Sequence, residues 1–160
     1  MGKPSSPIRS RAPAPIPYVA GVDYDVPDEL IGYSLRRAQV AMFMAFDGAT
    51  RGVDITPPRF TALVIVGANP GISQTTLGQA LGIARSGAMM LTDWMEERGL
   101  AGRRRLPGDG RAWGVHLTAR GEKVLSSMKR RVSAEDRRRA GVLDARERRE
   151  LLRLLNKLAR

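Results

Sequence analysis

Apolar residues recur at helical spacing along much of this chain, most clearly between Ser73 and Leu81. There Leu77, Ala80 and Leu81 fall at i, i+3 and i+4, so one side of the segment is predicted to face a core. Ser73 can cap the free amides of the first turn, and Gly82 can take the left-handed conformation that ends a helix. The pattern predicts a short helix followed by a tight turn.

A second helix is predicted from about Ala84 to Arg98, with an apolar face made by Ala88, Leu91, Thr92 and Met95. The opposite face is free to meet a partner and carries Arg85, Ser86, Met89, Met90 and Asp93. Two short helices joined in this way are typical of a helix-turn-helix, whose second helix enters the major groove of DNA. Met89 and Met90 have a second interpretation as packing residues, a common role of methionine.

Segments 100–105 and 112–117 flank the sequence Leu-Pro-Gly-Asp-Gly-Arg, a turn-rich stretch that predicts a β hairpin. This hairpin is strongly basic, with Arg103, Arg104, Arg105 and Arg111. A run of arginines is often a solvated face, but a cationic hairpin directly after a helix-turn-helix favours contact with phosphates or the minor groove. Residues 56–117 are therefore predicted to form a winged helix-turn-helix.

The predicted helices on either side of this unit are too apolar to stand alone. A helix over 28–50 is apolar on more than one side, and the last helix presents Leu151, Leu155 and Leu158. Its start is marked by an Asp-x-x-Glu capping box at Asp144. A second copy of the chain is the simplest cover, so 28–50 and 118–160 are predicted to be dimerisation helices. A further, buried helix is predicted to follow Thr56, whose hydroxyl would cap its first turn.

The chain has 160 residues and a formal net charge of +11, a surplus that points to polyanions, although it also serves solubility or a membrane surface. No segment approaches the roughly 18 to 20 apolar residues of a membrane span, and no signal peptide is evident, so a cytoplasmic location is expected. Residues 1–26 are rich in proline and are expected to form a flexible or extended arm, which packing on a partner subunit could order from Tyr18 onward. Residues 27–160 are expected to form the folded domain.

The chain has no cysteine and a single histidine, His116. Disulfides, thiolate zinc ligands and thiol switches are therefore excluded, and one imidazole cannot build a typical zinc site or Ser-His-Asp triad. The carboxylates of Asp93, Glu96 and Glu97 are interpreted as a solvated helix face. We expect no enzymatic activity, no cofactor and no metal.

Six motifs occur in the order of a known family: Ser73-Gln-x-x-Leu77, Leu81-Gly-Ile-Ala-Arg-Ser86, Met95-Glu-Glu-Arg-Gly-Leu100, Arg103-Arg104, Asp109-x-Arg111 and Leu117-Thr118-x-x-Gly121. With them the chain, over about residues 28–160, resembles the MarR family of bacterial transcription regulators. Gly110 stands where the wing of that family usually has the first arginine of Asp-Arg-Arg, and Met90 where a DNA-contacting arginine is common. The resemblance therefore moves the wing contact to Arg111 or Arg105.

The resemblance implies a mainly α fold with a small β wing, about six helices and one hairpin, in a homodimer that represses a neighbouring operon. Its recognition helices would enter successive major grooves of a near-palindromic operator with half-sites about 10 bp apart. Arg85 and Ser86 would read base edges, beside Met89 and Met90. Phosphates would be held by Ser73, Gln74, Thr75 and Thr76, and the wing arginines 103, 104, 105 and 111 would complete the interface.

The family resemblance also implies release from DNA by a small molecule, often an aromatic acid, a phenol or an aromatic coenzyme A thioester. The side chains that could line its site are Tyr33, Arg36, Arg37, Phe43, Phe60 and His116. Arg36 and Arg37 could instead extend to solvent, and Phe43 and Phe60 could be plain core. The competing interpretation of the whole chain is a basic protein that coats or bends DNA without sequence preference.

Overall fold

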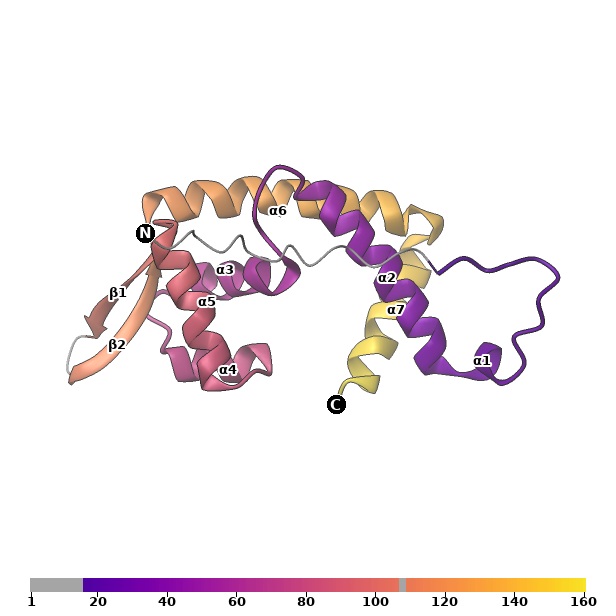
Figure 1. Ribbon diagram of the computed structural model, residues 1–160, viewed down its shortest axis with the longest axis horizontal. Coiled ribbons are helices and arrows are strands. Elements are labelled where there is room, and N and C mark those ends of the chain that lie inside the picture. The colour runs from indigo at the N-terminus through magenta and orange to yellow at the C-terminus, as the bar shows by residue number, and fades with distance from the viewer. Residues whose placement is uncertain (1–15, 107–108) are drawn as a thin grey trace, which may run out of the picture.

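A computed structural model describes residues 16–106 and 109–160, without the side chains of residues 106–112. It confirms the predicted fold class, mainly α with a small β wing (Figure 1). The elements in chain order are α1 (Val26–Glu29), α2 (Ile31–Ala49), α3 (Pro57–Ala68), α4 (Gln74–Leu81), α5 (Arg85–Glu97), β1 (Ala101–Leu106), β2 (Asp109–Leu117), α6 (Ala119–Arg139), a 3-10 turn (Ala140–Val142) and α7 (Ala145–Leu158).

The long helix α6 joins two groups of elements (Figure 1). At its N-terminal end lie α3, α4, α5 and the antiparallel hairpin of β1 and β2, which is the predicted helix-turn-helix with its wing. At its other end lie α1, α2 and α7. No helix in the described part of the chain is both long and apolar enough to cross a membrane.

Most of the predicted helix ends are confirmed. Ser73 caps α4 by accepting a hydrogen bond from the Thr76 amide at 3.0 Å, and Gly82 ends this helix in the left-handed region with φ 65°. The capping box at Asp144 is complete. These three positions set the length and entry direction of the helices that they bound.

Two expectations about helix starts are wrong. The helix expected over 28–50 is interrupted at Leu30, whose extended backbone (ψ 118°) separates α1 from α2. Thr56 precedes α3 but its hydroxyl makes no capping bond. Pro57 and Pro58 follow it directly and have no amide hydrogen, so the first turn has fewer amides for a cap to satisfy.

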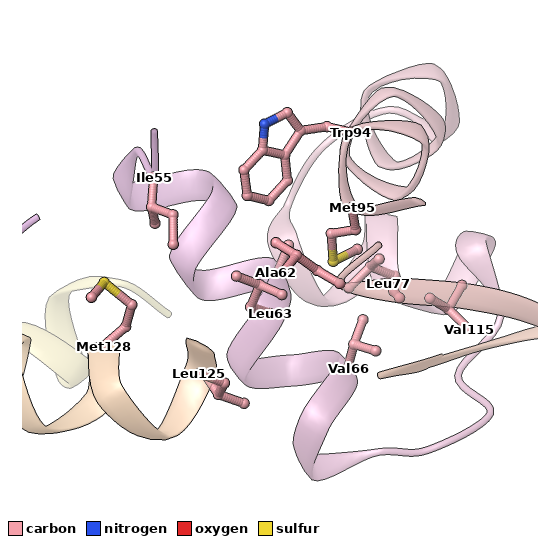
Figure 2. Close-up of a cluster of buried hydrophobic side chains, with 12 residues drawn as sticks. Ile55, Ala62, Leu63, Val66, Leu77, Trp94, Met95, Val115, Leu125 and Met128 are labelled. Carbon is pink, nitrogen blue, oxygen red and sulfur yellow. The ribbon is translucent and has the colours of Figure 1, made fainter. Parts of the chain in front are cut away.

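The core is built around α3, whose Ala62, Leu63 and Val66 are fully buried (Figure 2). The other elements each direct apolar side chains toward it: Leu77 from α4, Met95 from α5, Val115 from β2, and Leu125 and Met128 from α6. Ala88, Thr92 and Met95 are buried as predicted for α5, but Trp94, which the pattern did not place, is buried with them. The helix-turn-helix and the start of α6 therefore share one core.

Gly121 fixes how closely α6 approaches the hairpin. A Cβ at this position would lie 1.9 Å from the carbonyl oxygen of Leu100, so any other residue would force the two elements apart. Thr118 holds the same junction, because its hydroxyl donates to the Gly99 carbonyl at 2.7 Å and accepts from the Gly121 amide at 3.0 Å. The wing is thus held directly against the helix that leads to the other half of the molecule.

Candidate nucleic-acid interface

The outer face of α5 is open to solvent as a recognition helix requires. Arg85 and Ser86 in its first turn are exposed, and Met89 and Met90 are 49% and 70% exposed. The interpretation of these methionines as packing residues of the subunit core is therefore wrong. The face combines a guanidinium and a hydroxyl, which can hydrogen-bond to base edges, with two flexible apolar side chains.

The N-terminus of α4 lies at the start of the helix-turn-helix and presents Thr75 and Thr76 to solvent. Its amides point out of the first turn, where they and the hydroxyls can bind a phosphate. Ser73 is half-buried and already shares hydrogen bonds with Thr76, to its amide and to its hydroxyl at 2.8 Å. Gln74 differs from the other three, because its side-chain nitrogen is buried and has no hydrogen-bond partner among the described residues.

Arg103 is engaged inside the protein. Its guanidinium lies 2.5 Å from Asp93 and also pairs with Glu96, while its backbone amide donates to Glu96 at 2.9 Å. The expectation that Asp93 and Glu96 form a solvated face is therefore wrong, since they bind the wing. Only Glu97 fits it, with a side chain that is 73% exposed. Sequence spacing held a signal, because Asp93 and Glu96 lie at i and i+3 on one side of a helix.

Arg104 and Arg105 are exposed on β1. The Arg105 guanidinium lies 5.7 Å from the ring centre of Trp113, its partner in the hairpin register. Trp113 is 50% exposed, and the sequence-based reasoning did not single it out. The available signal was an aromatic residue two positions before Val115, on the same face of the predicted strand. The side chain of Arg111 lies outside what the structure describes.

Behind the recognition helix, Trp94 is enclosed by two arginines. The guanidinium carbons of Arg59 and Arg98 lie 4.7 and 5.1 Å from its ring centre, and both arginines donate to Asp54 at 2.7 Å. Burial raises the pKa of the Asp54 carboxyl, but the two arginines lower it more, so the pKa lies below its ordinary value. This cluster ties the loop before α3 to the C-terminal end of α5.

The six candidate ligand residues do not form one site. Phe60 packs against Phe46, with ring centres 5.7 Å apart. Arg36 and Phe43 are exposed on α2, whereas Arg37 lines a cavity of about 470 Å³ between α2 and α6. His116 lines a separate cavity at the base of the wing. The ring centre of Tyr33 lies 5.9 Å from the guanidinium carbon of Arg37, so these two of the six residues are neighbours.

The segment before α1 makes contacts within its own chain, and its expected packing on a partner subunit stays a prediction. Tyr18 stacks on Tyr24 with ring centres 4.7 Å apart, and the Arg37 guanidinium lies 4.8 Å from the Tyr18 ring. The Tyr18 hydroxyl donates to Asp28 at 2.6 Å, which raises its pKa. Residues 1–15 of the arm expected over 1–26 lie outside the described residues.

No group of three or more histidine, aspartate or glutamate residues gathers as a metal site within the described ranges. The chemistry of the exposed face is that of hydrogen bonding and positive charge. It can hold a polyanion and read a groove, through a helix with a polar first turn and a wing that bears arginines.

Comparison with known proteins supports this description. The family model for the MarR family matches residues 53–112. A putative transcriptional regulatory protein for the hcr operon of Thauera aromatica is 33% identical over 131 residues, which cover 81% of this chain and 79% of that protein. The repressor Rv2887 of Mycobacterium tuberculosis is 28% identical over 82% of this chain and 94% of its own.

Among solved structures, the transcriptional repressor CouR bound to a 23-mer DNA duplex is 35% identical, with a TM-score of 0.82 over 87% of this chain and 99% of its own. CouR bound to p-coumaroyl-CoA is 34% identical, with a TM-score of 0.77 over 87% of this chain and 98% of its own. These relatives are transcriptional regulators rather than enzymes. The chain therefore belongs to the MarR family of transcriptional regulators, as its motifs predicted.

Proposed function

We propose that this protein is a homodimeric repressor that binds a near-palindromic operator in the cytoplasm and releases it when a small aromatic ligand binds. The observation that carries the proposal is the outer face of α5, exposed from Arg85 to Met90 and flanked by the exposed arginines of the wing. CouR, which shares the fold at 35% identity, was solved on a DNA duplex. In the same geometry α5 enters the major groove and the wing reaches the neighbouring backbone or minor groove.

The dimer is supported by the apolar surface of α7. Leu151, Leu152, Leu154 and Leu158 are 45 to 57% exposed. Together with α2, this helix lines an apolar groove of about 750 Å³. Burying each such leucine releases roughly 1 kcal/mol or more, so a second copy that covers α2 and α7 is stabilised by several of them. The two-fold axis of such a dimer places its two recognition helices about one turn of DNA apart, which matches the half-sites of a palindromic operator.

The proposal is tested by selecting bound fragments from the DNA beside the gene of this protein and footprinting the strongest. A repressor of this kind protects one site of about 20 bp with two-fold symmetry. Its affinity for that site exceeds that for random duplex by about a thousandfold or more at the same salt concentration. A protein that only coats DNA would bind both duplexes nearly equally, and that result would reject the proposal.

We propose that the effector enters the cavity at Arg37. Four arginines line it, Arg37, Arg51, Arg138 and Arg139, together with Glu135, which pairs with Arg138. The Arg37 Nε is buried and has no partner among the described residues, so an acceptor from a ligand would satisfy it. Phosphates suit such a cavity, and CouR was solved with p-coumaroyl-CoA. Rv2887, solved with salicylic acid, supports the simpler aromatic acid as the alternative.

The effector is identified by titrating the footprinted operator complex with p-coumaroyl-CoA, free coenzyme A and salicylate in a gel-shift assay. The thioester is expected to release the DNA, and Arg37→Ala is expected to weaken its effect about tenfold through the loss of a charge-assisted hydrogen bond. Arg36→Ala is the matched control, since Arg36 is exposed and its replacement removes the same charge from the same helix. Equal effects of the two substitutions would reject the assignment to this cavity.

A further inference from the structure

A second cavity, of about 660 Å³, lies at the base of the wing. It is formed by the end of α3, both hairpin strands and the first half of α6. Arg104 and His116 line it from the hairpin, and Glu122, Lys129 and Arg130 line it from α6. The cavity does not share a lining residue with the one at Arg37, so the two are separate sites.

Strand alternation explains why this side of the hairpin is hollow. Arg103 turns toward α5, so its neighbour Arg104 projects from the opposite face. The register pairs Gly102 with His116 and Arg104 with Gly114, which leaves Arg104 and His116 as the two side chains among these four positions on that face. A Cβ built at Gly102 would meet no atom within 4 Å, which confirms that space is open there.

The lining combines positive charge with an apolar floor. Arg104, Lys129 and Arg130 carry three positive charges against the single carboxylate of Glu122, and the His116 imidazole adds a hydrogen-bond donor. Leu117 and Leu125 supply apolar surface between them. A cavity with this composition favours an organic anion, whose charged end pairs with the cations while its apolar body covers the leucines.

We propose that this wing-base cavity binds a small organic anion and that the anion competes with DNA phosphate for Arg104. The second half of the proposal rests on the proposed function, because it requires that the wing contacts DNA. A guanidinium held by a bound carboxylate cannot form the same bidentate bond to a phosphate. The anion then lowers the affinity for DNA, and DNA lowers the affinity for the anion by the same factor, as thermodynamic linkage requires.

His116 makes binding directly visible, because it is the single histidine of the chain and gives one imidazole Cε1 proton signal in the NMR spectrum of the symmetric dimer. The probe is naphthalene-2-carboxylate, and the uncharged naphthalene-2-methanol is its control. The carboxylate is expected to shift the signal in a saturable way, because a ligand bound beside the imidazole changes the environment of this proton. No shift, or an equal shift with the alcohol, overturns the proposal.

Lys129→Glu and Lys123→Glu separate the cavity from the general charge of α6. Both reverse one exposed lysine on this helix, but only Lys129 lines the cavity. Lys129→Glu is expected to weaken binding of the carboxylate about five- to tenfold, and Lys123→Glu is expected to leave it nearly unchanged. Equal weakening by both variants would mean that the probe follows the net charge of the helix, and the site would be rejected.

The competition is measured as the Kd for the footprinted operator with and without the carboxylate, at constant ionic strength. The carboxylate is expected to raise this Kd in the wild-type protein, and to raise it much less in Arg104→Gln, whose operator affinity is already lower. A bound carboxylate that leaves the Kd unchanged overturns the competition. If the protein selects no operator but the His116 signal still shifts, the proposed function fails while the cavity stands.

Discussion

Arg103→Ala separates the two roles that an arginine of the wing can have. The sequence predicts a DNA contact at this position, whereas the structure uses the guanidinium to join β1 to α5 through Asp93 and Glu96. If its role is structural, the substitution lowers the stability of the protein and loosens the wing. If it binds a phosphate, the substitution lowers DNA affinity and the dependence of that affinity on salt.

The size of the stability effect follows from exposure. The side chains of Arg103, Asp93 and Glu96 are 26%, 47% and 30% exposed, so solvent screens the pair with Asp93 more than the pair with Glu96. We assign about 0.5 kcal/mol to the first pair and about 1 kcal/mol to the second. A loss of about 1.5 kcal/mol lowers the Tm of a chain of this size by roughly 3 to 6 °C.

The assay compares Arg103→Ala with Arg104→Ala, which removes the same charge from the neighbouring residue of the same strand. Thermal unfolding gives the stability of each variant, and operator titrations between 50 and 200 mM salt, about the usual range for such slopes, give the number of phosphates that the protein neutralises. Arg104→Ala is expected to flatten the slope by about 0.9 for each phosphate that is no longer neutralised, or about 1.8 in a dimer, with little change in Tm. Arg103→Ala is expected to show the reverse.

A double-mutant cycle with Glu96→Gln completes the test. The two substitutions remove the same ion pair, so their effects on stability are expected to fall short of additivity by about 1 kcal/mol. Additive effects, or an Arg103→Ala variant that keeps its Tm and flattens the salt slope as Arg104→Ala does, would contradict a structural role for Arg103 and return it to the DNA-binding residues.

Three further results are expected. Asp54→Asn is expected to lower the free energy of unfolding by about 1 kcal/mol above pH 4, a figure already discounted for the exposure of the carboxylate. Because the pKa of Asp54 is lowered in the folded protein, the stability difference from wild type is expected to disappear in acid denaturation as the pH falls through that pKa. Leu154→Glu in the groove of α7 shifts sedimentation toward single subunits, and an intact dimer would contradict our interface. Trp113→Ala weakens operator binding about fivefold with little change in Tm, whereas Trp113→Phe keeps most of the affinity.

The helix-turn-helix could be predicted because its signals are local. Ser73, Gly82, Leu77 and the buried positions of α5 act within one or two turns and appear in the structure where the spacing puts them, whereas Ala80, predicted to face the core from α4, is exposed. The packing of Trp94 between Arg59 and Arg98 could not be predicted, because it joins a loop, α3 and the end of α5. Periodicity identifies a buried face but does not identify the residues that another element brings to it.

The three consecutive arginines of β1 show the same limit most clearly. Their shared residue type suggests one role, yet alternation directs Arg103 and Arg104 to opposite faces of the hairpin, where Arg103 meets two carboxylates and Arg104 meets a cationic cavity. Arg105 returns to the face of Arg103 but lies farther along the strand, toward the turn of the hairpin, where its guanidinium lies over the exposed Trp113. A charge of +1 is therefore paired within the protein at Arg103, lines a cavity at Arg104 and lies over an exposed ring at Arg105, and we propose ligand and DNA binding for Arg104 alone among these environments. Counting the arginines of such a hairpin overestimates the number of phosphates it binds unless those already paired within the protein are subtracted.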